Sequence, residues 1–129
     1  MARWLVDGMN VIGSRPDGWW RDRRGAQRAL VEQLRAFADE GGHEVTVVFD
    51  GSRHAVEGST GGVRVLFASR TGRDAADDDI AALARRDAAA LTAAGLTVVT
   101  SDADLAARVK AHGAEVAGAG SFRRLLDRE

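Results

Sequence analysis

Cysteine is absent from this sequence of 129 residues. Its absence excludes disulfide bridges and thiolate metal sites, and a reducing cytoplasm is then the simplest setting for the chain. Only one residue is proline, and with 45% hydrophobic residues the composition is typical of a compact globular protein. The sequence also lacks any apolar run of membrane-spanning length and the N-terminal pattern of a signal peptide. We therefore expect a cytoplasmic protein with no membrane partner.

Lysine is nearly absent as well. Of the 18 basic residues only Lys110 is lysine, and all the others are arginine. The simplest explanation is the compositional bias of a GC-rich genome, because alanine and glycine are also abundant. Arginine nevertheless makes bidentate contacts to phosphate that lysine cannot make. The formal net charge of -1 by itself indicates no class of partner.

Buried strands alternate with helices along the chain, whose length is typical of one domain, so we interpret residues 1–129 as a single unit. Between residues 13 and 20, Gly and Pro predict a loop. This alternation predicts an α/β fold, a three-layer α/β/α sandwich around a mostly parallel sheet of four to five strands. The expected strands are 3–7, 44–49, 63–67, 96–100 and 115–117, and the expected helices are 22–40, 75–94, a short one ending near 112, and 121–126.

Three of the expected strands end at or just before an aspartate, namely Asp7, Asp50 and Asp102. Carboxyl ends of parallel strands share one edge of the sheet, and open α/β folds bind ligands at that edge. In the expected helix 75–94, helical phase places Asp77 on the buried face. Each acid alone has an ordinary structural explanation as a turn or helix-start residue. Their common placement is what favours a functional site.

Converging carboxylates repel one another unless a cation lies among them. Oxygen ligands without Cys or paired His favour a hard ion, so we expect Mg²⁺ or Mn²⁺. Asp7, Asp50, Asp77 and Asp102 are the expected metal ligands, and Asn10 would orient water or substrate. The number of ions stays open. Supporting roles are expected for Asp78, which competes with Asp77, and for Ser101 and Asp104.

A substrate rich in phosphate needs positive charge around such an acidic centre. Arginines follow the first two strands and precede the acidic helix, on segments that should surround the same edge. Trp19 and Trp20 would stack on bases of a single strand, although a Trp pair beside a helix start is more often a packing feature. The expected phosphate contacts are Arg15, Arg24, Arg53 and Arg73.

Four segments, taken in order, resemble the motifs of the YacP-like branch of NYN domains, in the PIN-like nuclease superfamily. The resemblance spans nearly the whole chain, with Met9 at a position where the family usually has an aromatic residue. It implies a PIN-like Rossmannoid sheet and a metal-dependent ribonuclease site, with the family's acids at Asp7, Asp50, Asp77 and Asp102. The segments are Val6-Asp7-Gly8-Met9-Asn10-Val11-Ile12, Val48-Phe49-Asp50, Ala76-Asp77-Asp78-Asp79-Ile80 and Thr100-Ser101-Asp102.

The leading hypothesis is therefore a metal-dependent endoribonuclease acting on RNA, with the ribosome as a further candidate partner. An alternative is a non-catalytic RNA- or ribosome-binding module in which the acids hold a structural ion. A phosphatase of small substrates is disfavoured because no second Asp stands two residues after Asp7 and no Gly-rich phosphate cradle follows. A dehydrogenase is also disfavoured, since the turn after the first strand lacks the dinucleotide fingerprint. The sequence leaves the oligomeric state and the particular RNA open.

Overall fold

A computed structural model describes residues 3–50, 58–60, 62–68, 75–89 and 95–127 of the chain. Over these residues the strands form one sheet in the order β3-β4-β2-β1-β5-β6. Five strands are parallel to their neighbours and β3 alone pairs antiparallel, on β4. The strands are β1 (Arg3–Asp7), β2 (Glu44–Phe49), β3 (Gly58–Thr60), β4 (Val63–Phe67), β5 (Leu96–Val99) and β6 (Glu115–Ala117).

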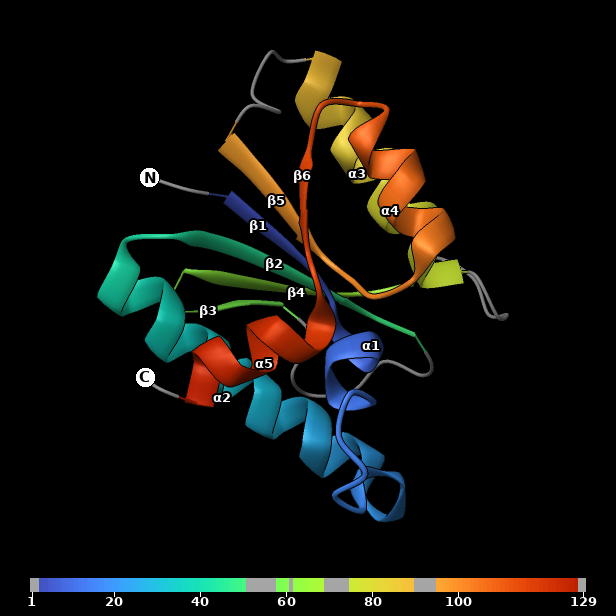
Figure 1. Ribbon diagram of the computed structural model, residues 1–129. Coiled ribbons are helices and arrows are strands. Elements are labelled where there is room, and N and C mark those ends of the chain that lie inside the picture. The colour runs from blue at the N-terminus through green and yellow to red at the C-terminus, as the bar shows by residue number, and fades with distance from the viewer. Residues whose placement is uncertain (1–2, 51–57, 61, 69–74, 90–94, 128–129) are drawn as a thin grey trace.

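Helices cover both faces of this sheet (Figure 1). On one side α1, α2 and α5 pack against a core that includes Val6, Val47 and Phe122, and on the other α3 and α4 pack against Leu5 and Val98. The α/β/α sandwich predicted from the sequence is confirmed. The helices are α1 (Gly8–Ile12), η1 (Trp19–Arg21, a 3₁₀ turn), α2 (Arg23–Gly41), α3 (Ala75–Ala89), α4 (Ala103–Lys110) and α5 (Ala119–Asp127).

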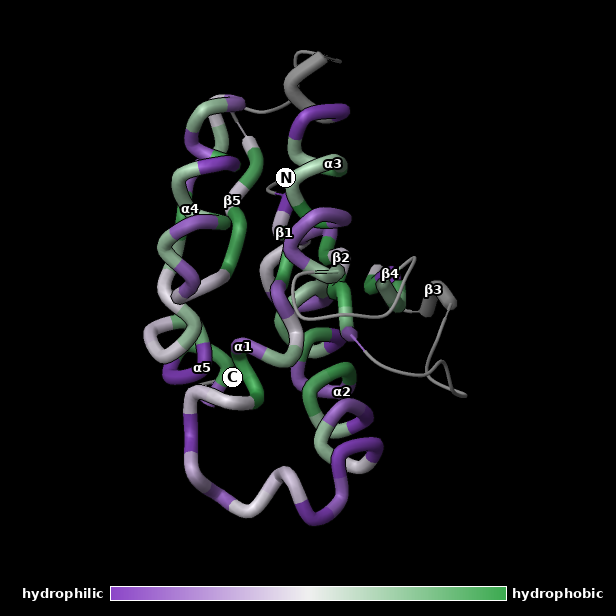
Figure 2. Tube along the Cα trace, turned by 90° about the vertical axis from the view of Figure 1, so that its right-hand side faces the viewer, coloured by the Kyte–Doolittle hydropathy of each residue, from purple (hydrophilic) through white to green (hydrophobic). Residues whose placement is uncertain are grey.

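Neighbouring residues of the central strands are buried on both faces, which is why these strands appear in the sequence as continuous apolar runs. In β2, Val47 and Val48 point to opposite cores, and both are essentially inaccessible to solvent. Hydrophobic residues accordingly lie along the strands, whereas the connection from α1 to α2 is mostly hydrophilic (Figure 2). No described helix is long and apolar enough to cross a lipid bilayer.

Three short elements differ from the sequence prediction. The 13–20 segment, expected to be a loop, contains the start of η1. Strand β3 lies in a polar Gly- and Ser-rich connection whose composition predicts no strand. The turn expected after β1 is the helix α1, which begins at Gly8.

Gly8 is required at the start of α1 by close packing against β2. A Cβ placed on Gly8 would lie 2.4 Å from two carbons of the Phe49 ring and 3.0 Å from Val47 Cγ2. Only glycine lets the backbone of α1 approach the sheet this closely. The first helix therefore turns sharply beside the carboxyl end of β1.

The strand order also determines where a ligand site is expected. The chain runs from β1 outward to β2 and β4, and then returns past β1 to β5 and β6 on the other side. The helix α2 covers one face of the sheet, and α3 covers the other. Connections diverge in this way at a topological switch point, where open α/β sheets bind ligands. Here that point lies at the carboxyl ends of β1 and β5.

Candidate active site

Asp7 is the last residue of β1 and stands at the switch point. It is one of the few buried polar residues among those described, with 6% of its surface exposed. The Thr100 hydroxyl, directly after β5, donates to Asp7 Oδ2 at 3.1 Å. The same hydroxyl oxygen accepts from the Asp102 N–H at 3.1 Å. Thr100 therefore joins the exit of β1 to the exit of β5 and orients the Asp7 carboxyl.

Burial raises the pKa of Asp7 from 3.8 to about 6. Removal of the carboxylate from water is the largest cause, and the negative charges of Asp77 and Asp50 raise the pKa further. The Thr100 hydroxyl and the Asn10 backbone N–H act in the opposite direction. Asp77 and Asp50 are thus each close enough to Asp7 to act on its charge.

Asn10 holds the loop after β5 in place. Its Oδ1 accepts a hydrogen bond from the Ser101 N–H at 2.7 Å. The Ser101 hydroxyl in turn accepts from the Ala119 N–H, at the start of α5, at 2.9 Å. The two side chains connect α1, the end of β5 and α5 around the carboxyl edge of the sheet. The side-chain oxygen of Asn10 is therefore engaged with protein in this arrangement.

Asp50 follows β2 at the same edge and is partly buried. Its Oδ1 forms an ion pair with the Arg23 guanidinium, which comes from the first residue of α2. The contact links the acidic edge to the start of α2, where several arginines are exposed. Arg23 supplies positive charge next to the site, although it is not one of the four arginines expected to contact phosphate.

The acids of α3 have different surroundings. Asp77 lies near enough to Asp7 to act on its pKa. Asp78 instead accepts a hydrogen bond from Arg108 of α4 at 3.0 Å, with both side chains partly exposed. Asp78 thus joins α3 to α4, and Asp77 is the α3 residue that acts on the carboxyl at the end of β1.

Asp102 serves as the N-cap of α4. Its Oδ1 accepts from the Leu105 N–H at 2.9 Å, satisfying a backbone donor that has no partner within the helix. Asp104 lies exposed in the first turn of α4. Asp102 therefore has the ordinary structural role of a helix-start residue, which the sequence also permits. One of its carboxylate oxygens is engaged in this cap.

The expected ligands do not form a compact cluster as their side chains stand. Within the part of the chain that the structure describes, no three His, Asp or Glu side chains are placed together to hold an ion. Asp50 and Asp102 each contact a protein donor, which keeps one oxygen of each engaged. Asp7 combines burial with the charge of two neighbouring acids.

The chemistry of these groups nevertheless fits a hard divalent cation. The carboxylates of Asp7, Asp50 and Asp77 offer oxygen ligands, which Mg²⁺ and Mn²⁺ prefer. Burial is the main cause of the raised pKa of Asp7, and a cation would relieve the repulsion from Asp77 and Asp50 that raises it further. Asp7, Asp50 and Asp77 are the residues that would hold such an ion. Asp102 is connected to Asp7 through the Thr100 hydroxyl, which contacts both residues.

The four arginines expected to contact phosphate have different outcomes. Arg15 forms an ion pair with Asp127 at the end of α5. Arg24 is exposed near the start of α2. Arg53 and Arg73 lie outside the described residues.

Thr100 is the site residue that sequence reasoning missed. It is buried, with 2% of its surface exposed, and both hydrogen bonds of its hydroxyl go to site residues or their backbone. In the sequence Thr100 follows Val98 and Val99 and resembles them as a β-branched residue at a strand end, so it was not singled out. A polar residue directly before Ser101-Asp102 was the available signal.

Comparisons with known proteins agree with this fold. The model of the family described as YacP-like NYN domain matches residues 4–129. The crystal structure of Rae1 (YacP) from Bacillus subtilis, as a W164L mutant, has 28% sequence identity and a TM-score of 0.75. That match covers 99% of this chain and 76% of the other. The structure of Rae1 (YacP) from the same organism without that mutation has 26% identity and a TM-score of 0.75, with 99% and 75% covered. No curated protein matches the sequence significantly.

Proposed function

The chain belongs to the YacP-like NYN domain family, a nuclease-type domain, and from this premise we propose that it is a metal-dependent endoribonuclease. The observation that carries the proposal is Asp7, a buried carboxyl at the switch point whose pKa is raised to about 6. A buried acid with a strongly perturbed pKa at the ligand edge of an α/β sheet is typical of a functional site.

The residues around the Asp7 carboxyl have different roles. Thr100 holds Asp7 in one orientation through its hydroxyl. Asp77 and Asp50 add negative charge near Asp7, which would attract a divalent cation. When bound, Mg²⁺ or Mn²⁺ would polarise the phosphodiester and lower the pKa of an attacking water. Arg24, exposed near the start of α2, would contact the backbone phosphates of RNA.

The test is cleavage of labelled RNA by the purified protein with Mg²⁺, Mn²⁺ or a chelator. We expect cleavage with either ion and none with the chelator. Asp7→Asn should lower kcat/KM at least about a hundredfold, because a cation site contributes several kcal/mol to transition-state stabilisation. Asp39→Asn is the matched control, since Asp39 is exposed on α2 and has no place in the site.

Two results would contradict the proposal. One is equal cleavage by the wild type and Asp7→Asn, which would locate the activity elsewhere or in a contaminant. The other is RNA binding without any metal-dependent turnover, which would instead identify a non-catalytic RNA-binding module. DNA oligonucleotides of the same sequence belong in the panel because they test the preference for RNA.

A further inference from the structure

Trp20 is an exposed indole in the connection between α1 and α2. With 56% of its surface exposed, it is the one large hydrophobic side chain that is exposed among the described residues. It belongs to η1, in the connection from α1 to α2, which is otherwise mostly hydrophilic (Figure 2). Burial of an aromatic side chain of this size would be favourable, so its exposure needs an explanation.

The neighbouring residues support Trp20 from beneath. Trp19 is partly buried and packs against the core on the α2 and α5 side of the sheet. The two indole rings meet edge to face, with centroids 5.9 Å apart and planes at 85°. Gly18 provides a left-handed backbone turn at φ 85°, and Asp17 Oδ1 accepts from the Trp19 N–H at 3.2 Å. One Trp of the pair is therefore an anchor, and the other is presented to solvent.

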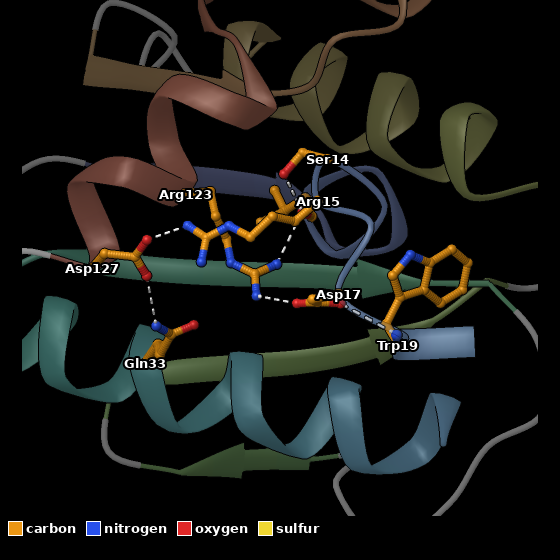
Figure 3. Close-up of polar contacts among 8 residues, drawn as sticks. Ser14, Arg15, Asp17, Trp19, Gln33, Arg123 and Asp127 are labelled. Carbon is orange, nitrogen blue, oxygen red and sulfur yellow. Dashed lines mark hydrogen bonds and ion pairs between the residues drawn. The ribbon is translucent and has the colours of Figure 1, made fainter. Parts of the chain in front are cut away.

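Distant parts of the chain hold this segment in place (Figure 3). Arg123 of α5 donates to the Val11 carbonyl at 3.2 Å and contacts Asp17 at 3.5 Å. Its side chain is only 15% exposed, as expected of a structural residue. Arg15 forms a second link to α5 through its ion pair with Asp127. Trp20 thus stands on a segment tied to the body of the domain by two separate arginine contacts.

Arginines flank Trp20 in the sequence. Between positions 15 and 28 the sequence has five Arg and two Asp. Arg21, Arg24 and Arg28 are exposed, and no acidic partner is recorded for them among the described residues. Arg23, the first residue of α2, contacts Asp50 directly after β2. Trp20 and these arginines thus lie within one stretch of the chain, which Arg23 connects to Asp50 at the carboxyl edge of the sheet.

We propose that Trp20 is a base-stacking platform for single-stranded RNA, with Arg21 and Arg24 contacting the phosphates on either side of the stacked nucleotide. The proposal rests on the proposed function for the identity of the nucleic acid. A planar ring flanked by arginines fits a base and its phosphates, because stacking is sequence-tolerant and the charges are complementary. In a duplex the base faces are already covered by neighbouring bases, so the platform selects unpaired RNA.

A protein or membrane partner fits this surface less well. The core of a protein interface usually buries several aromatic or aliphatic groups with few charges, whereas here a single indole stands among arginines. Binding at a membrane surface likewise requires a broad apolar face. The ring and its charged surroundings match the chemistry of a nucleotide.

The experiment measures RNA binding in the Asp7→Asn background, so that no cleavage occurs. Fluorescein-labelled single-stranded RNA of 12 nucleotides and the matching blunt duplex serve as probes. Trp20→Ala should weaken binding of the single strand about tenfold, because loss of one stacked base has an effect of this size. Trp20→Phe should retain most of the affinity, and duplex binding should change little. Arg86→Ala on α3 is the control for a general loss of positive charge.

Thermal unfolding of each variant checks that the substitutions leave the fold intact. We expect a Tm close to that of the wild type for the Trp20 variants, because Trp20 contributes little to the core. Unchanged single-strand affinity in Trp20→Ala would overturn the platform, even if the wild type cleaves RNA. So would an equal loss for single strand and duplex, or a change of oligomeric state without a change in RNA affinity. If no cleavage occurs but single-strand binding still depends on Trp20, the platform stands and the endoribonuclease proposal fails.

Discussion

At the scale of single residues, Asp7 experiences burial and neighbouring charge acting in the same direction. Both favour its protonated form, whereas the Thr100 hydroxyl favours the ionised one. The other acids at this edge have ordinary partners. Arg23 pairs with Asp50, and Asp102 caps α4. Asp7 is therefore an acid whose charged form is disfavoured by its surroundings.

We predict that stability without divalent cations depends on pH through Asp7. Its pKa is 3.8 when unfolded and about 6 when folded, so the folded state binds the proton more tightly. The stabilisation by this proton is complete below pH 4 and is lost as the pH rises through about 6. The loss amounts to at most about 3 kcal/mol in the free energy of unfolding. Urea unfolding in a chelating buffer between pH 4 and 7.5 measures it.

Asp7→Asn supplies the comparison, because asparagine keeps an acceptor for Thr100 and has no charge to lose. The variant should be more stable than the wild type at pH 7 and should show a weaker pH dependence between 4 and 6. If the stability of the wild type and of the variant changed with pH in the same way, the raised pKa assigned to Asp7 would be contradicted. Asp39→Asn should follow the wild type, since Asp39 is exposed.

At the scale of elements, α1 decides how the strand ends are arranged. It begins directly after β1 and is tied to the loop after β5 through Asn10 and Ser101. Its sharp entry depends on Gly8, above which the Phe49 ring of β2 leaves no room for a side chain. The site is therefore assembled by contacts between α1, β2 and the end of β5, which are far apart in the sequence.

We predict that Gly8→Ala destabilises the domain by about 1–3 kcal/mol, because the added methyl group meets a buried ring that must move. Thermal or urea unfolding measures the change. Gly95→Ala is the matched control, since a Cβ at Gly95 has no atom within 4 Å, and its effect should stay within about 0.5 kcal/mol. Equal effects of the two substitutions would contradict the close approach at Phe49.

At the scale of the whole molecule, the two helical layers place different groups around the switch point. The layer with α1, α2 and α5 brings Asn10, Arg23 and the Trp20 segment, and the layer with α3 and α4 brings Asp77. The sheet between them contributes Asp7 and presents Thr100 after β5. Because the groups come from both faces, the site depends on the integrity of the whole sandwich.

We predict that Mn²⁺ or Mg²⁺ stabilises the wild type. At a concentration a hundred times the dissociation constant, the gain is about 2.7 kcal/mol, or roughly 10 °C in Tm for a domain of this size. The gain should decrease at pH 5, where a proton competes for Asp7. Calorimetry with each ion and with a chelator measures it. An equal shift in Asp7→Asn would contradict the assignment of Asp7 as a ligand.

The sequence by itself determined the layers and the common edge of the acids. The strands Arg3–Asp7, Glu44–Phe49 and Leu96–Val99 are readable because burial on both faces requires continuous apolar runs. Parallel pairing then places Asp7 and Asp50 at the same edge. The amphipathic helix Arg23–Gly41 is likewise evident from its period and from Gly41-Gly42 at its end. These features depend on local pattern and on the rules of chain connection.

Only the tertiary structure decided what each polar group contacts. Nothing local in the sequence tells that Asp78 reaches Arg108, that Arg15 pairs with Asp127, or that Thr100 lies against Asp7. Each of these contacts joins residues at least 30 positions apart, and each depends on how two elements pack. Burial is likewise a property of the assembled core. The sequence could therefore place Asp7 at an edge, but only the folded molecule buries its carboxyl and brings Asp77 and Asp50 close enough to raise its pKa.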